Sequence, residues 1–260
     1  MHLADLVRGK RALDEILPRE CTPNRLSGVV LAGSVLPALE RAIGDVVAQT
    51  LAALPAGKRL RILEIGAAQP TFAAGICRTL DFERCDFVFA TTASSVPEEC
   101  AGLQENYPGV PIRPIGEELL DAAEPPANEQ FHLALLAADV ASDREAMLAL
   151  AYAKRHLCAG GAVLVLKEHP SRWMDFVFGG RRSWWKEASG GNWISRHKPP
   201  AHWRSQMQKL GFQHVTVLDM VADGASGPFL VLSQMLEHAV GPSPRPLPSR
   251  CVTSRVIAPR

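Results

Sequence analysis

Residues 60–70 read LRILEIGAAQP, a short apolar run that closes on Gly66 and continues into a turn containing Pro70. An apolar run of about four to eight residues that ends on glycine is typical of a buried strand in a parallel sheet. The E-x-G pattern at its end, Glu64 to Gly66, is common in α/β folds and by itself names no function. We therefore expect a buried parallel strand over residues 60–66 with a turn after it.

The segments around this strand alternate between strand-like and helix-like patterns. Further strands are expected at residues 87–90, 110–112, 131–136, 162–166, 214–218 and 228–232. Helices are expected at residues 34–54, 73–80, 98–107, 144–157 and 203–210. Such alternation predicts an α/β fold with a mostly parallel, doubly wound sheet. The last two strands are separated by only nine residues, too few for a crossover helix, so we expect an antiparallel hairpin there.

Composition describes a globular protein and excludes several classes. The chain has 260 residues, 47% of them hydrophobic, and a net charge of +1, which gives no overall attraction to nucleic acid or an anionic membrane. The chain contains no apolar stretch of about 18 residues, so we expect no membrane span. Its N-terminus lacks the apolar core of a signal peptide. The six cysteines are scattered without a C-x-x-C pair. We expect no metal site, and free, mostly buried thiols in a cytoplasmic protein.

The chain divides into three parts on these patterns. Residues 1–56 form a helical lead-in or lid, residues 57–236 form the α/β core, and residues 237–260 form a linker or tail rich in proline.

The turn after Gly66 resembles motif I of S-adenosylmethionine-dependent class I methyltransferases, which has the form E-x-G-x-G-x-G. The resemblance implies that Glu64 and Gly66 belong to a cofactor loop, but alanine and proline replace its later glycines at Ala68 and Pro70. Those glycines let the backbone approach the cofactor closely. A Cβ at Ala68 occupies that space, and Pro70 lacks a backbone N–H. We expect this loop not to hold S-adenosylmethionine.

Later segments are similar to the C-methyltransferase domains of modular polyketide synthases. The similarity rests on Phe178–Gly179, on Trp184–Trp185, and on Trp203 followed by residues 210–212, which read LGF. It covers about residues 30–235, and those domains also carry an N-terminal lid.

The resemblance also implies two residues that this chain lacks. An acidic residue usually closes the second strand and binds the ribose hydroxyls, but Thr91 stands there, or Thr92 if the alignment shifts by one. A histidine acts as the base that removes a proton from the substrate carbon, but its position falls near Ala141. The assisting glutamate matches Glu168, which we expect to be left without a partner, and we expect the side chain of the adjacent His169 to point elsewhere.

These losses together predict a pseudo-methyltransferase: a non-catalytic, structural domain of a polyketide or fatty acid synthase that binds no cofactor. Its partners would be flanking synthase domains and an acyl carrier protein, and its parent chain an acyltransferase-type synthase. One alternative is an active C-methyltransferase that acts on a carrier-bound β-ketoacyl thioester. Another is a standalone α/β ligand-binding module. The aromatic and basic stretch over residues 172–198 either packs a small core or contacts a carrier protein.

Overall fold

The computed structural model describes residues 36–67, 70, 72–115, 129–136, 143–180, 184–187, 193–195, 197–220 and 227–235, with a few single residues before position 16. Two predicted site positions, Ala68 and Ala141, lie outside the described residues. So do most of the expected lead-in before residue 36 and the proline-rich tail over residues 237–260.

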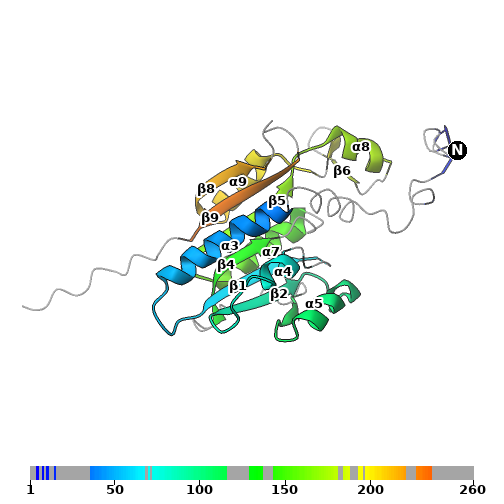
Figure 1. Cartoon of the computed structure of the whole chain (residues 1–260). Helices are drawn as coiled ribbons and strands as arrows, with labels where there is room; N and C mark the ends of the chain where they lie inside the picture. The colour runs from blue at the N-terminus through cyan, green and yellow to red at the C-terminus, as the bar shows by residue number, and fades with distance from the viewer. Residues whose placement is uncertain are drawn as a thin grey trace, which may run out of the picture.

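The described part of the chain contains a seven-stranded sheet with the order β3-β2-β1-β4-β5-β9-β8 (Figure 1). Its strands are β1 (Leu60–Gly66), β2 (Cys85–Thr91), β3 (Ile112–Pro114), β4 (Phe131–Leu136), β5 (Leu157–Glu168), β8 (Gln213–Asp219) and β9 (Pro228–Gln234). Strands β1 to β5 run parallel, and β9 lies antiparallel between β5 and β8. The predicted parallel sheet with a C-terminal antiparallel hairpin is confirmed.

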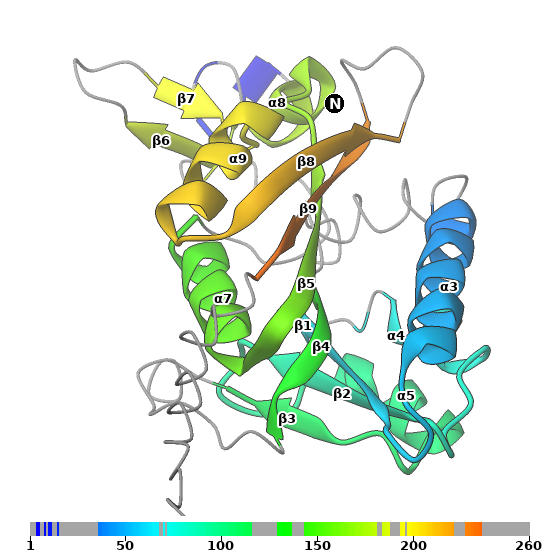
Figure 2. The same ribbon diagram turned by 90° about the vertical axis from the view of Figure 1, so that its left-hand side faces the viewer.

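Helices cover both faces of this sheet. They are α3 (Leu36–Ala53), α4 (Ala73–Cys77), α5 (Ala101–Asn106), α7 (Asp143–His156), α8 (Arg172–Phe178) and α9 (Pro200–Lys209), with a 3-10 turn, η2 (Glu98–Cys100), before α5. Figure 2 shows α3 on one side of the sheet, and α7 and α9 on the other. None of the described helices combines the length and apolarity that crossing a membrane requires.

Alternation along the strands produces two hydrophobic cores. In β1, Ile62 packs with Leu39 and Ile43 of α3, whereas Leu63 faces the core that includes Ala149 of α7. All five side chains are at most 2% exposed, so β1 is buried on both faces. This explains why its sequence is a continuous apolar run rather than an alternating one.

Several predicted boundaries were wrong for physical reasons. Strand β5 begins at Leu157, so Gly160 and Gly161 lie inside the strand rather than in a turn before it. Gly160 has a φ of 76°, which glycine adopts without strain. Helix α4 ends at Cys77 instead of Leu80, and the edge strand expected at residues 110–112 lies at residues 112–114.

Helix α8 and a small hairpin, β6 (Trp185–Glu187) with β7 (Trp193–Ser195), were not predicted. Tertiary contacts hold this region. Trp184 is 1% exposed and packs with Met174 and Phe178, and its ring N–H donates a 2.8 Å hydrogen bond to Asp175. The aromatic stretch therefore forms a small core, although Trp173 on the outer face of α8 is 55% exposed.

Candidate functional site

The turn after β1 and the end of β2 lie side by side at the carboxyl edge of the sheet. Gly66 pairs in register with Thr91 on the neighbouring parallel strand. Strand β1 has β2 on one side and β4 on the other, so this is the point where the strand order reverses. Ligands of open α/β sheets bind at such a point. The structure thus brings together two residues that the resemblance places, separately, in the cofactor site.

Thr91 is turned into the protein rather than toward a ligand. Its hydroxyl donates a 2.5 Å hydrogen bond to the carbonyl oxygen of Ala67 and accepts a 3.1 Å hydrogen bond from the N–H of Ala93. The backbone N–H of Thr92 donates a further 2.9 Å hydrogen bond to the carbonyl of Gly66. Because Thr91 has no exposed surface, it offers no acceptor to a ligand at this edge of the sheet.

Thr92, the alternative position for the ribose acid, contacts a carboxylate that the sequence did not predict. Its hydroxyl is hydrogen-bonded to Glu145, which lies in the first turn of α7. Helix α7 packs against β4 and β5 and shares a hydrophobic core with β1 and β2, and its first turn brings Glu145 to Thr92. No short sequence spacing could reveal this pair, because 53 positions separate the two residues.

Glu64, a residue of β1, is hydrogen-bonded to the end of the loop that follows this strand. Its side chain is fully buried, and one carboxylate oxygen accepts a 2.9 Å hydrogen bond from the backbone N–H of Phe72, where α4 begins. Pro70 lies half-buried in the connection between them. Burial, with a smaller contribution from the charge of Glu64, raises the pKa of the nearby Cys77 thiol to about 12. This thiol is therefore protonated and unreactive.

A second cluster lies at the carboxyl end of β5. The Oε2 atom of Glu168 is 3.9 Å from Nδ1 of His197, and the same nitrogen lies 3.4 Å from the carbonyl oxygen of His169. The ring of His197 packs against Trp184, with centroids 5.2 Å apart. The expectation that Glu168 has no partner is therefore wrong. His197 was missed because it follows β7, an element that the sequence does not predict.

His169 points away from Glu168, as predicted. Its Nε2 atom is 2.8 Å from Oδ1 of Asp219, and its ring packs edge-on against Phe229. His169 therefore joins the end of β5 to the end of β8. No group of three or more His, Cys, Asp or Glu side chains within the described ranges is placed to hold a metal ion.

Three solved structures resemble this chain. The CurJ carbon methyltransferase has a TM-score of 0.64 and 16% identity, and the match covers 90% of this chain and 64% of that chain. The methyltransferase domain of the citrinin polyketide synthase has a TM-score of 0.63 and 21% identity, with 90% and 62% covered. The trans-methyltransferase CalH in complex with SAH has a TM-score of 0.61 and 18% identity, with 90% and 64% covered. The chain has the class I methyltransferase fold. No family model matches it.

The sequence of this methyltransferase-like chain is also similar to a segment of a synthase. It is 26% identical over 233 residues to the non-reducing polyketide synthase dpfgA of Gibberella zeae, and the match covers 84% of this chain and 10% of that protein. The chain thus spans about a tenth of that synthase and less than two thirds of each of the three solved methyltransferases.

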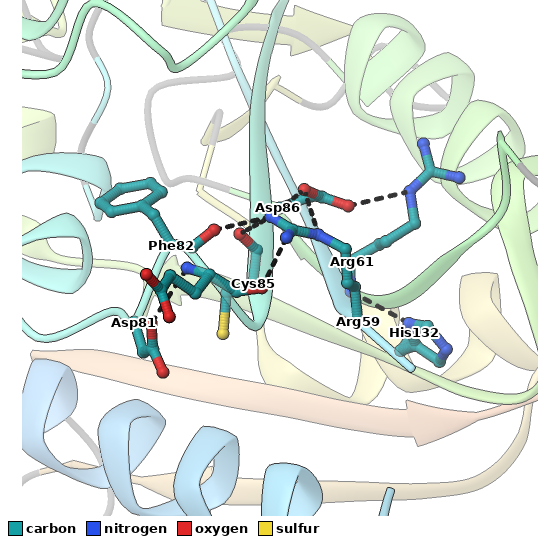
Figure 3. A network of polar contacts seen from close by, with 8 residues as sticks. Arg59, Arg61, Asp81, Phe82, Cys85, Asp86 and His132 are labelled. Carbon is teal, nitrogen blue, oxygen red and sulfur yellow. Dashed lines mark hydrogen bonds and ion pairs between the residues drawn. The ribbon is translucent and has the colours of Figure 1, made fainter. Parts of the chain in front are cut away.

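Within the methyltransferase fold, both residue clusters lie at the carboxyl edge of the sheet, because Gly66, Thr91 and Glu168 each end a parallel strand. His132 lies at the opposite edge, near the start of β4. Its Nδ1 atom accepts a 3.0 Å hydrogen bond from the backbone N–H of Arg61, as Figure 3 shows. Burial, followed by the charge of Arg61, lowers the pKa of His132. His132 therefore acts as a neutral acceptor that extends the pairing of β1 with β4.

Proposed function

We propose that this chain is a methyltransferase-like domain of a polyketide synthase that neither binds S-adenosylmethionine nor transfers a methyl group. The similarity to a segment of a polyketide synthase and the class I methyltransferase fold support the first half of the proposal. The observation that carries the second half is the hydrogen bond from the hydroxyl of Thr91 to the carbonyl of Ala67.

That hydrogen bond bears directly on whether the cofactor fits. Two ribose hydroxyls are held best by a carboxylate that accepts from both of them. Thr91 is neutral, fully buried and already bonded to Ala67 and Ala93. The carboxylate of Glu145 is engaged by Thr92. The residues at the end of β2 therefore do not fit S-adenosylmethionine.

The backbone of the turn supports the same conclusion. The carbonyl oxygen of Gly66 accepts from Thr92, and that of Ala67 accepts from Thr91, so the turn is bonded to β2 rather than presented to a ligand. Pro70 has no N–H to offer to a carboxylate or a hydroxyl. A domain with such a turn keeps its fold, and its remaining role is to hold flanking synthase domains and an acyl carrier protein in place.

Calorimetric titration of S-adenosylmethionine into the chain tests this proposal. We expect no saturable heat. A dissociation constant below about 100 μM, which corresponds to roughly −5.5 kcal/mol, would overturn it. The double variant Ala68→Gly, Pro70→Gly restores the glycines of motif I, and Ala74→Gly, at an exposed position of α4, is a matched control for lost side-chain volume. Binding gained by the double variant but not by the control would show that the loop is the cause.

A second candidate function, C-methylation of a carrier-bound β-ketoacyl thioester, is favoured by one observation: the pairing of Glu168 with His197. A histidine held by a carboxylate is suited to remove a proton from a carbon next to a carbonyl. In this candidate Glu168 orients the imidazole of His197, and Trp184 packs against its ring.

Mass spectrometry separates the two candidates. The chain is incubated with S-adenosylmethionine and a β-ketoacyl thioester on a carrier protein, and the acyl group is weighed. A gain equal to one methylene group that His197→Gln abolishes and His214→Gln retains would establish the second candidate. An unchanged mass with folded protein supports the first.

A further inference from the structure

A helix and a hairpin, α8 with β6 and β7, lie together beyond the carboxyl end of β5, as Figure 2 shows. We call these three elements the α8 unit. Its own core consists of Met174, Phe178 and Trp184, which pack as a cluster distinct from the two cores of the sheet. Individual side-chain contacts therefore matter for where the α8 unit lies relative to the sheet.

His197 lies where the α8 unit meets the sheet. It comes two positions after the end of β7, and its Nδ1 atom is 3.9 Å from Oε2 of Glu168 and 3.4 Å from the carbonyl oxygen of His169. Its ring packs against Trp184, in the core of the α8 unit, with centroids 5.2 Å apart. The imidazole is thus held between the end of β5 and that core.

Asp175 of α8 binds both of the groups that flank His197. Its Oδ1 atom accepts a 2.8 Å hydrogen bond from the ring N–H of Trp184 and a 2.6 Å hydrogen bond from the hydroxyl of Ser195. Trp184 is the ring beside the imidazole, and the oxygen of Ser195 accepts a 3.3 Å hydrogen bond from the backbone N–H of His197. One carboxylate oxygen therefore fixes both the ring next to the imidazole and the backbone that carries it.

The burial of Trp184 makes its hydrogen bond to Asp175 important. The side chain of Trp184 is 1% exposed, so its ring N–H cannot turn to water in place if the carboxylate is removed. A hydrogen bond to a carboxylate is also about twice as strong as one between neutral groups. Loss of the carboxylate leaves a buried donor unsatisfied, which favours movement of the ring toward water and away from its place beside His197.

We propose that Asp175 is a positioning residue, which holds the imidazole of His197 beside the carboxylate of Glu168. It acts through Trp184 and Ser195 rather than by touching reacting atoms. This inference deepens the second candidate function, C-methylation, and its importance for catalysis rests on that function. A base must lie close to the carbon whose proton it removes, and a displacement of about 1 Å can lower a rate about 100-fold.

The coupling between Glu168 and His197 measures the placement of the imidazole and needs no methyl transfer. A carboxylate close to an imidazole favours the charged form of the ring. We therefore expect Glu168→Gln to move the midpoint of the NMR pH titration of the His197 ring to lower pH by about one unit. In the Asp175→Ala background the ring is no longer held, and the same change should leave the midpoint almost where it was.

Asp175→Asn separates hydrogen bonding from charge. It keeps an oxygen acceptor for Trp184 and Ser195 but is neutral, so a positioning role predicts that the full coupling returns in this background. Two other titratable residues lie in the cluster: His169, and Lys198, whose ammonium group donates a 2.6 Å hydrogen bond to the carbonyl of Ser195. Both are unchanged within each comparison, so their charges cancel in the measured difference.

A second resonance separates a folding defect from a change of placement. The ring N–H of Trp185 donates a 2.7 Å hydrogen bond to the carbonyl of Gly179, so its NMR signal reports whether the α8 unit is folded. If Asp175→Ala abolishes that signal, Ser195→Ala takes its place, because it removes one of the two hydrogen bonds and should weaken the coupling in part. The matched control is Asp45→Ala, at an exposed position of α3, which should keep the full coupling.

The proposal is overturned if Glu168→Gln has its full effect in folded Asp175→Ala, or in Ser195→Ala where that variant is needed, because the imidazole would then keep its place unaided. It is also overturned if Glu168→Gln has no effect in the otherwise unaltered chain, because the two side chains would then not lie together. If the coupling behaves as expected but mass spectrometry finds no methyl transfer, the placement of His197 by Asp175 stands and only the second candidate function fails.

Discussion

The hydroxyl of Thr91, the last residue of β2, donates a 2.5 Å hydrogen bond to the carbonyl oxygen of Ala67 in the turn after β1. A side chain at the end of β2 thus closes the turn from within the protein. In a sheet whose ligand site lies at these strand ends, this contact uses the groups that would otherwise meet a ligand.

Replacing Thr91 with valine should destabilise the protein by about 1 kcal/mol, because the shape is kept but a buried hydrogen bond is lost. Urea unfolding followed by circular dichroism measures the change. Thr91→Ser keeps the hydroxyl and should recover most of the loss. Thr216→Val, at an exposed position of β8, should stay within about 0.5 kcal/mol of the unaltered chain. If Thr91→Val lowers the free energy of unfolding no more than Thr216→Val does, the hydrogen bond of Thr91 does not hold the turn.

The adjacency of Gly66 and Thr91 was predictable, since the carboxyl ends of neighbouring parallel strands meet at one edge of a sheet. Strands β1 and β4 matched their predicted bounds because each is a buried, continuous apolar run. The contacts of Thr92 with Glu145 and of Glu168 with His197 were not predictable. Each joins elements far apart in the chain, and only the packed fold brings them together.

The boundaries that failed lie where tertiary contacts override local signals. Gly160 and Gly161 are typical of a turn, yet Leu157 already pairs with Phe131 of β4, so the strand begins before the glycines. Helix α8 has only seven residues, too few for a helical pattern to be recognised. It is held by the N-cap side chain of Ser171 and by the packing of Trp184.

Cys77 should resist alkylation in the folded protein. Burial, helped by the charge of Glu64, raises its pKa from 9.0 to about 12, so almost no thiolate is present at pH 8. Mass spectrometry after brief iodoacetamide treatment should find Cys77 unmodified in native protein and modified in urea. The half-buried Cys158 is the internal comparison and should react sooner. Rapid native labelling of Cys77 would show that α4 opens locally or that the thiol is not buried.

Stability should fall as the pH drops below 6.5, partly because of His132. Its pKa is lowered in the folded state by burial and by Arg61, so the unfolded chain binds the proton more readily than the folded chain. The stabilisation that neutral His132 provides is therefore complete above pH 6.5. It is lost as the pH falls through the lowered pKa that His132 has in the folded state. His132→Asn keeps an acceptor for the N–H of Arg61 and should make thermal unfolding less dependent on pH between pH 7.5 and 5. His214→Asn, at an exposed position, should leave that dependence unchanged. Equal slopes for all three proteins would contradict the role given to His132.

The link between His169 and Asp219 predicts that the ends of β5 and β8 are coupled through a side chain. The two residues lie on either side of β9, and Nε2 of His169 is 2.8 Å from Oδ1 of Asp219. Asp219→Ala removes the oxygen that is hydrogen-bonded to the buried imidazole of His169. We therefore expect the free energy of unfolding, measured with urea, to fall by about 1 kcal/mol. Asp219→Asn keeps an oxygen acceptor and should lose less. Because His197 contacts the backbone carbonyl of His169 and not its imidazole, either variant should change the chemical shifts of the His197 ring less than those of the His169 ring in an NMR spectrum. A His197 shift as large as that of His169 would mean that the two histidines act as one unit.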